Sequence, residues 1–263
     1  MTDPQAPPAA WRSPPAGLAL GPTDVHVWRL PLAQPHEHLA ILARTLSHDE
    51  RERARRFYFD RDRNAFTAAR GALRTLAGYY AGHPPADLVF GYQAKGKPYL
   101  TTPPDDLRFN LSHSGDFALL AFTRGRELGD DVERRRAKDD LRSVARGAFS
   151  PEEYATLCSL PAHEHTVAFF ACWSRKEAFI KTTGEGVSQL GDFDVNLRPG
   201  EPARILRVAG VLPGQYPWSI HDLPAIPGHA ASLVVASHDV RISCWDWPPS
   251  HSGDAADRPA TIR

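Results

Sequence analysis

The sequence is poor in lysine and cysteine and has no surplus of either charge, and the last two features argue against particular classes of protein. Lysine plus arginine equals aspartate plus glutamate at 31 each, so the formal net charge is zero, whereas proteins that bind nucleic acid usually carry a basic excess. The three cysteines, Cys158, Cys172 and Cys244, stand far apart without a Cys-x-x-Cys pair. This spacing argues against a disulfide framework or a cysteine zinc site.

Long apolar runs are also missing. No stretch approaches the roughly 18 consecutive apolar residues that a membrane helix needs. The N-terminus lacks the basic segment followed by an apolar run that directs secretion. We therefore expect a cytoplasmic protein that binds neither a membrane nor nucleic acid.

Lysine occurs only five times beside 26 arginines, so its positions are informative. Four of the five lysines lie in two short motifs, KGKP at 95–98 and RKEAFIK at 175–181. Chance clustering, with KGKP as an ordinary charged turn, is the alternative interpretation.

Turn residues and hydrophobic periodicity predict blocks of helix and strand. Ser47 followed by Glu50 has the spacing of a helix-capping box, and Ser150-Pro151 combines a cap with a first-turn proline. Long helices are predicted over 63–80 and 164–183, the first stopped near Gly82 and the second at Gly184. The predicted strands cover 25–30, 88–93, 108–113, 117–123, 127–133, 193–197, 218–221, 231–237 and 240–247.

This order of elements predicts an α+β fold. Helices followed by strands occur twice, so we expect two α+β halves, residues 23–127 and residues 128–247. The proline-rich segment 1–22 and the polar segment 248–263 are predicted to be disordered tails.

The predicted helix 63–80 has two distinct faces. Phe66, Leu73 and Tyr80 recur every seven residues and form its buried stripe. A second face is basic and is either solvated or used to bind anions. It comprises Arg63, Arg70 and Arg74.

The strand LGDDVE carries a pair of carboxylates on one face. Side chains two apart on a strand point to the same side, so Asp131 and Glu133 share a face and Asp130 points away. Two adjacent carboxylates repel each other, and burying them is costly unless a cation lies between them. A solvated strand end is the alternative.

Two further motifs place chemistry-bearing side chains. In WSRKEAFIK, the spacing puts Trp173, Glu177 and Lys181 roughly along one helix face, where an ordinary surface ion pair is the alternative. In FNLSHSG, Ser112 lies on the strand face opposite the apolar residues, and His113 ends the strand. A structural or solvated histidine is the alternative there.

Taken together, these carboxylates, lysines, histidine and arginines suit the binding of Mg²⁺ and a polyphosphate. Magnesium prefers one or two carboxylates plus phosphate oxygens and water, and basic side chains neutralise the remaining phosphate charge. The sequence has no phosphate loop GxxxxGK[ST], no GxSxG elbow and no HExxH helix.

In the order of its motifs the chain resembles the phosphopantetheinyl transferase family of the surfactin-synthetase-activating (Sfp) type. GDDVE at 129–133 and WSRKEAFIK at 173–181 correspond to the family's paired motifs. GKP at 96–98, NLSHSG at 110–115 and the helix LSHDERERARRF precede them in the family's order. The resemblance covers residues 46–190, over half of the chain.

The resemblance implies a fold of two similar α+β halves packed as an intramolecular pseudo-dimer, with coenzyme A in the cleft between them. It also implies a monomer that transfers phosphopantetheine from coenzyme A to a serine of an apo acyl or peptidyl carrier protein. Asp131, Glu133 and Glu177 would hold Mg²⁺, and Glu177 would also be the general base. Lys181 would neutralise charge at the pyrophosphate.

The same resemblance implies an anion-binding set for coenzyme A. His113, with Ser112 and Lys97, would hold the 3′-phosphate and nearby phosphates. Arg53 and Arg70 would add positive charge from the helices.

One residue departs from the family pattern. Asp130 stands where the family usually has valine or isoleucine, on the core side of the strand. Either Asp130 reaches a partner or water, or the strand register shifts and Asp130 replaces Asp131 as a ligand. Two other functions stay open: a coenzyme A or carrier-protein binding module without catalysis, and a Mg²⁺-dependent phosphodiesterase or nuclease.

Overall fold

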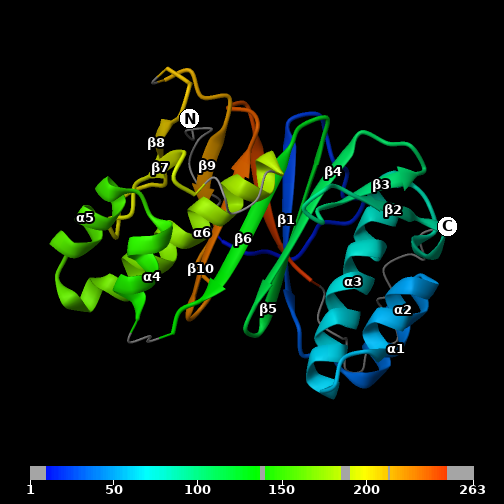
Figure 1. Cartoon of the computed structure of the whole chain (residues 1–263). Helices are drawn as coiled ribbons and strands as arrows, with labels where there is room; N and C mark the ends of the chain where they lie inside the picture. Colours follow the sequence, from blue (N-terminus) through cyan, green and yellow to red (C-terminus); the bar gives the residue numbers. More distant parts are fainter. Residues whose placement is uncertain (1–9, 137–139, 185–189, 213, 248–263) are drawn as a thin grey trace.

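The chain passes through two successive sets of helices and strands (Figure 1). The computed structural model describes residues 10–136, 140–184, 190–212 and 214–247. The first set comprises β1 (Asp24–Pro31), α1 (His36–Thr45), α2 (His48–Arg55), α3 (Asp60–Ala81), β2 (Val89–Tyr92), β3 (Pro98–Thr102), β4 (Leu107–Ser114) and β5 (Phe117–Arg124). The second comprises β6 (Leu128–Arg134), α4 (Leu141–Ala148), α5 (Pro151–Ser159), α6 (His165–Thr183), β7 (Phe193–Val195), β8 (Ile205–Val208), β9 (Ser219–Asp222), β10 (His229–Val235) and β11 (Arg241–Asp246).

The helix ends follow the local signals of the sequence. The backbone N–H of Ser47 donates to the Glu50 carboxylate at 3.0 Å at the start of α2, and Ser150 caps α5 through the backbone N–H of Glu153 at 3.2 Å. Gly82 and Gly184 end α3 and α6 in the left-handed conformation, which glycine adopts without steric cost. None of the described helices is both long and apolar enough to cross a membrane.

Two sheets lie against each other at the centre of the molecule, and helices cover their outer sides (Figure 1). The first sheet has the order β11-β1-β5-β4 and the second the order β6-β10-β9, while β2-β3 and β7-β8 form separate hairpins. The fold is therefore α+β with two halves joined in one chain, which confirms the predicted class.

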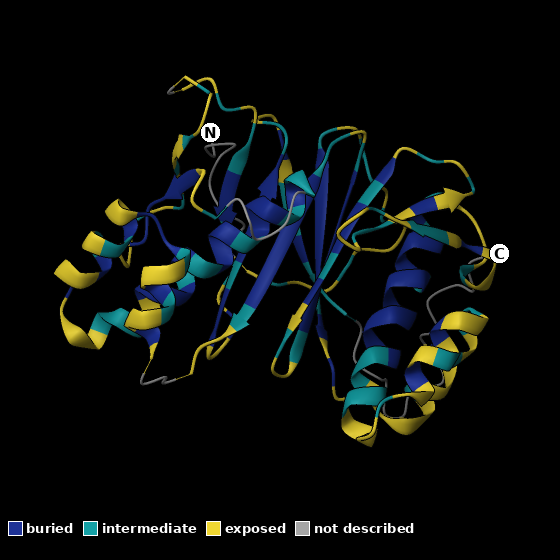
Figure 2. Cartoon of the chain, in the orientation of Figure 1, coloured by how far each residue is buried: buried dark blue, intermediate teal, exposed yellow. Residues whose placement is uncertain are grey.

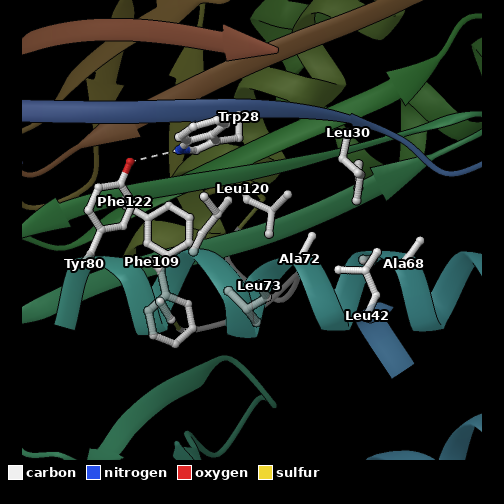
Figure 3. Close-up of a cluster of buried hydrophobic side chains, with 14 of the residues drawn as sticks. Trp28, Leu30, Leu42, Ala68, Ala72, Leu73, Tyr80, Phe109, Leu120 and Phe122 are labelled. Carbon is white, nitrogen blue, oxygen red and sulfur yellow. Dashed lines mark hydrogen bonds between the residues drawn. The ribbon is translucent and has the colours of Figure 1, made fainter. Parts of the chain in front are cut away.

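A hydrophobic core fills the space between α3 and the first sheet (Figure 3). Leu73 and Tyr80 of the predicted stripe are buried there against Leu120 and Phe122 of β5. Phe66, the third member of the stripe, is only half-buried and packs instead against Phe57, with the two rings tilted and their centroids 5.5 Å apart. Figure 2 shows the central strands and much of α3 as buried.

The contact between the two sheets is the inter-sheet interface, a second apolar core. It contains Val25, Val27, Leu119 and Ala121 from the first sheet and Leu128, Val132, Leu233 and Val235 from the second. Since Leu128 and Val132 face this interface, the alternate residues Gly129, Asp131 and Glu133 of β6 face α6. Gly129 shows the closeness of that helix, because a Cβ there would lie 2.3 Å from the backbone oxygen of Ala178.

The ends of the described chain cross the expected boundaries. Strand β11 pairs in parallel with β1, so residues 241–246 of the expected second half lie in the sheet of the first. Residues 10–22, predicted as part of a disordered tail, make contacts with the rest of the fold. Arg12 forms an isolated β-bridge with Trp245, and the Trp11 indole donates a hydrogen bond to the Pro224 oxygen at 3.0 Å. Residues 1–9 and the expected tail 248–263 lie outside the described residues.

Candidate active site

Strand β6 and helix α6 bring together the acidic and basic side chains of the two central motifs. The Lys181 Nζ donates to Asp131 Oδ1 at 2.6 Å, and the Ser174 hydroxyl donates to the backbone oxygen of Asp131 at 3.2 Å. Glu177 lies one helical turn before Lys181. The structure therefore places Glu177 and Lys181 opposite the β6 face that carries Asp131 and Glu133.

The electrostatics of this group reflect burial and crowding of carboxylates. Asp131 is 3% exposed, and burial raises its pKa to about 7 although Lys181 opposes the rise. Burial also raises the pKa of Glu177, with Lys181 opposing and Glu133 adding to the rise. Burial alone would lower the pKa of Lys181, but Asp131, together with Asp130 and Glu177, more than offsets it, so the ammonium is stabilised.

The carboxylates Asp131, Glu133 and Glu177 are ligands that a hard cation prefers, but their side chains do not surround a common point. In the described part of the chain, no three His, Cys, Asp or Glu side chains are arranged to hold a metal ion. Asp131 bonds Lys181, and Glu133 accepts from the Ser114 hydroxyl at 3.0 Å. Asp131 Oδ2 is nevertheless buried without a hydrogen-bond partner. An unpartnered oxygen among three carboxylates fits Mg²⁺, which takes oxygen ligands.

Asp130 has partners on the far side of β6. Its Oδ1 accepts from Asn110 Nδ2 at 3.1 Å and its Oδ2 from the Ser112 hydroxyl at 2.5 Å. Burial raises the pKa of Asp130, while Ser112 acts against this. Of the two expected alternatives, the structure therefore has Asp130 bonded to a partner, with Asp131 and Glu133 on the face toward α6.

The predicted anion-binding residues on strands have different surroundings. His113 is exposed at the end of β4; partial burial lowers its pKa, as does the nearby Lys181, while Glu133 acts in the opposite direction. Ser112 is buried and bonded to Asp130. Lys97 donates to the Glu127 carboxylate at 3.1 Å and to the Leu128 oxygen at 2.8 Å. Of these three, His113 is the one near the charged group of β6 and α6.

Lys97 also borders a cavity between β3 and β4. This cavity has a volume of about 480 Å³. Its walls combine apolar and charged side chains, including Tyr99, Phe109, Arg108 and Glu127. It is a recess of suitable size and mixed polarity for a small molecule.

The two predicted helix arginines are engaged elsewhere. Arg70 is buried and pairs with Glu50, and its Nη2 donates to the Tyr92 hydroxyl at 2.6 Å. The Arg53 guanidinium lies 5.3 Å from the centre of the Phe66 ring. The contacts of Arg70 thus run to α2 and β2 rather than to the carboxylates of β6.

Sequence reasoning missed the side chains that join β4 to β6 and that buttress α6. Asn110 and Ser114 donate hydrogen bonds to Asp130 and Glu133 of β6. The alternation of polar residues along β4 could have indicated that this face of the strand meets other polar groups. Lys176 is fully buried and bonds the Glu153 carboxylate at 2.8 Å and the Phe193 oxygen at 2.7 Å. Lys176 therefore fixes α6 against α5 and β7. No sequence pattern linked Lys176 to Glu153, which belongs to the capping box of α5.

Comparison with known proteins gives the family of the chain. Residues 127–234 match the 4'-phosphopantetheinyl transferase superfamily, and residues 33–124 match the family described as 4'-phosphopantetheinyl transferase, N-terminal. The chain is 39% identical over 239 residues to the 4'-phosphopantetheinyl transferase HetI of Nostoc sp. (strain PCC 7120), covering 90% of this chain and 98% of the relative.

Two more distant relatives carry the same kind of name. The chain is 31% identical over 196 residues to the 4'-phosphopantetheinyl transferase Sfp of Bacillus subtilis (strain 168), covering 74% of this chain and 84% of the relative. It is 28% identical over 277 aligned positions to a phosphopantetheinyl transferase of Thraustochytrium sp., covering 98% of this chain and 91% of the relative. The chain, with its carboxylates and lysine between β6 and α6, belongs to the 4'-phosphopantetheinyl transferase superfamily.

Proposed function

We propose that this protein transfers 4'-phosphopantetheine from coenzyme A to a serine hydroxyl of an apo acyl or peptidyl carrier protein, with Mg²⁺ as cofactor and adenosine 3',5'-bisphosphate as the other product. The observation that carries the proposal is the grouping of Asp131, Glu177 and Lys181 between β6 and α6 in a chain of this family.

Glu177 is the candidate general base. A serine hydroxyl is a poor nucleophile near neutral pH and needs a base within hydrogen-bond reach. Glu177 is half-buried, and burial raises its pKa, so its carboxylate accepts a proton more readily than an exposed glutamate does. It would take the serine proton directly or through one water.

Lys181 and His113 are candidates for stabilising the anionic donor. The phosphorus that is attacked carries anionic oxygens, so cationic groups must draw off charge in the transition state. Lys181 keeps its proton because the pKa of its ammonium is raised by Asp131. Mg²⁺ held by Asp131, Glu133 and Glu177 would neutralise further charge on the pyrophosphate. The cavity beside Lys97 is a candidate recess for the nucleotide end of coenzyme A.

One chain supplies both sides of the proposed site. His113 belongs to the first half, whereas the carboxylates of β6 and α6 belong to the second. This arrangement supports action as a monomer. Asp130, with both carboxylate oxygens bonded, gives no support to a binding module without catalysis.

The test is intact-mass spectrometry of an apo carrier protein incubated with the protein, coenzyme A and Mg²⁺. We expect the carrier to gain one phosphopantetheine, and EDTA to abolish the gain. Glu177→Gln should reduce the rate by roughly 10²–10⁴-fold, the usual contribution of a positioned base. Glu152→Gln, an isosteric change at an exposed glutamate of α5, is the matched control and should transfer normally.

Two results would count against the proposal. If transfer persists in excess EDTA, the reaction does not require Mg²⁺. If Glu177→Gln and Glu152→Gln transfer at equal rates, Glu177 is not the general base.

A further inference from the structure

Asp130 is a buried carboxylate in an apolar row. Its neighbours on the same face of β6, Leu128 and Val132, are fully buried in the inter-sheet interface, and Asp130 is 0% exposed as well. Burying a carboxylate without partners is strongly unfavourable. Its side chain is therefore tolerated only because other groups bond it.

Both partners of Asp130 come from the other half of the molecule. Asn110 Nδ2 donates to the backbone oxygen of Asp130 at 2.9 Å and to its Oδ1 at 3.1 Å, and the Ser112 hydroxyl donates to Oδ2 at 2.5 Å. Asn110 and Ser112 are themselves buried, at 4% and 3% exposure. Because β4 and β6 belong to different sheets, these bonds cross the inter-sheet interface.

The next inward-facing residue of β4 continues the pattern. The Ser114 hydroxyl donates to Glu133 Oε2 at 3.0 Å and accepts from the backbone N–H of Arg134 at 3.1 Å. Residues 110, 112 and 114 lie on one face of β4, so this face is joined to β6 by side-chain hydrogen bonds. We call the bonds Asn110–Asp130, Ser112–Asp130 and Ser114–Glu133 the β4–β6 bonds.

We propose that Asp130 is a positioning residue that fixes β4 against β6 and so sets the distance between His113 and the charged group at Asp131 and Lys181. Asp130 directly precedes Asp131, and its partner Ser112 directly precedes His113. A shift of either strand would therefore move the two parts of the site relative to each other. The inference rests on the proposed function, because it takes coenzyme A as the ligand that spans both parts.

The two substrates should respond differently to a change at Asp130. Coenzyme A would contact both β4 and β6, so its binding depends on their separation. The carrier serine would meet Glu177 on α6, which packs on β6 within the second half. A loosened β4 should thus raise the KM for coenzyme A and leave kcat and the KM for the carrier nearly unchanged.

The test compares Asp130→Val and Asp130→Asn with Leu233→Ala. Leu233 pairs with Asp130 on β10 and is fully buried in the same interface, but it takes no part in the β4–β6 bonds. Binding of coenzyme A in EDTA is measured by titration calorimetry, with steady-state kinetics alongside. We expect Asp130→Val to raise the Kd and KM for coenzyme A about tenfold. Asp130→Asn should raise them less, because its amide can accept one of the two side-chain bonds.

A double variant distinguishes positioning from general loss of stability. Asn110→Val combined with Asp130→Val should weaken coenzyme A binding by less than the two single effects added together, because both changes break the bond between Asn110 Nδ2 and Asp130 Oδ1. Leu233→Ala should lower the Tm without changing the Kd. If Asp130→Val lowers the Tm like Leu233→Ala but leaves the Kd and KM unchanged, or if the two single effects add, the inference is wrong.

The outcome also separates this inference from the proposed function. Wild-type protein that binds coenzyme A but modifies no carrier would contradict the proposed function, and the calorimetry would still decide the role of Asp130. Should Asp130→Val fail to fold, Asp130→Asn and Asn110→Val provide the same comparison. Absence of coenzyme A binding by the wild type would overturn both.

Discussion

His26 of β1 is a buried histidine whose surroundings favour the neutral form. The Trp28 indole donates to the Tyr80 hydroxyl at 3.0 Å (Figure 3), so the hydroxyl proton of Tyr80 is free to go to His26 Nδ1, 2.9 Å away. A proton on Nδ1 would compete with that bond. Burial lowers the pKa of His26 to about 4, although Asp24 opposes the shift.

This site predicts a loss of stability in mild acid. The pKa of His26 in the folded protein lies below its ordinary value of 6.5, so below pH 6.5 the unfolded state takes up the proton first. The contribution of His26 to the free energy of unfolding should be complete above pH 6.5 and be lost as the pH drops toward 4. His221, whose pKa burial also lowers to about 4, should contribute in the same direction. Asp131, whose pKa burial raises to about 7, contributes with the opposite sign over the same range. Urea denaturation at pH 7, 6 and 5 measures the slope.

Substitution isolates the contribution of His26. His26→Phe should be less stable at pH 7, because Tyr80 loses a partner. Between pH 6.5 and 5, however, its free energy of unfolding should fall less than that of the wild type, because the contribution of His26 is gone. His163→Gln, at an exposed histidine, should keep the full slope. A slope in His26→Phe that matches the wild type would show that His26 is not held neutral.

At the residue scale, periodicity predicted which side chains share a face but not their partners. Strand and helix spacing placed Asp131 with Glu133 and Glu177 with Lys181, because those relations are local. The partner of Ser112 is Asp130, and that of Lys97 is Glu127. Asp130 lies on β6 and Glu127 directly precedes that strand. Only tertiary packing brings these residues to their partners, so sequence spacing carries no signal for the two pairs.

Helices α2 and α3 are joined by a buried charged cluster of Glu50, Arg70 and Arg74. Glu50 is 3% exposed and pairs with both arginines. Arg74 also donates to the Pro85 and Leu88 oxygens at 2.9 and 3.0 Å. The capping-box spacing predicted Glu50 in the first turn of a helix, and the helical wheel predicted an arginine face. Neither pattern could show that the two meet, because α2 and α3 are separated by a turn.

Removing the carboxylate of this cluster should be costly. Glu50→Gln would leave two buried guanidinium groups with no carboxylate partner, and we expect a loss of about 3–5 kcal/mol in the free energy of unfolding. The control is Glu52→Gln on the same helix, which breaks an exposed pair with Arg55 and should cost less than about 1 kcal/mol. Urea denaturation of both variants checks the difference. Losses of similar size would mean that the cluster adds nothing beyond a surface pair.

At the scale of the whole molecule, the sequence predicted two α+β halves but not that β11 joins the sheet of the first half. The division at residues 127 and 128 followed the change of pattern along the chain and stays a prediction. Strand β11 pairs with β1, more than 200 positions earlier, in a register that joins Val27 to Cys244. Pairing between strands so distant in sequence leaves no local pattern. The α+β class could be predicted because it depends only on the order of the elements.

The position of β11 predicts that the C-terminal strand is required by the first half. Truncation after Asp239 removes Val240 and β11, which exposes the edge of β1 and the interface around Val25 and Val27. We expect this truncated protein to lose cooperative thermal unfolding and coenzyme A binding, although every proposed site residue precedes the cut. Truncation after Trp247, which keeps all described residues, is the control and should unfold like the full chain. Circular dichroism measures the cooperativity of thermal unfolding, and titration calorimetry measures coenzyme A binding. A cooperative, coenzyme A-binding protein that ends at Asp239 would mean that the first sheet is complete without β11.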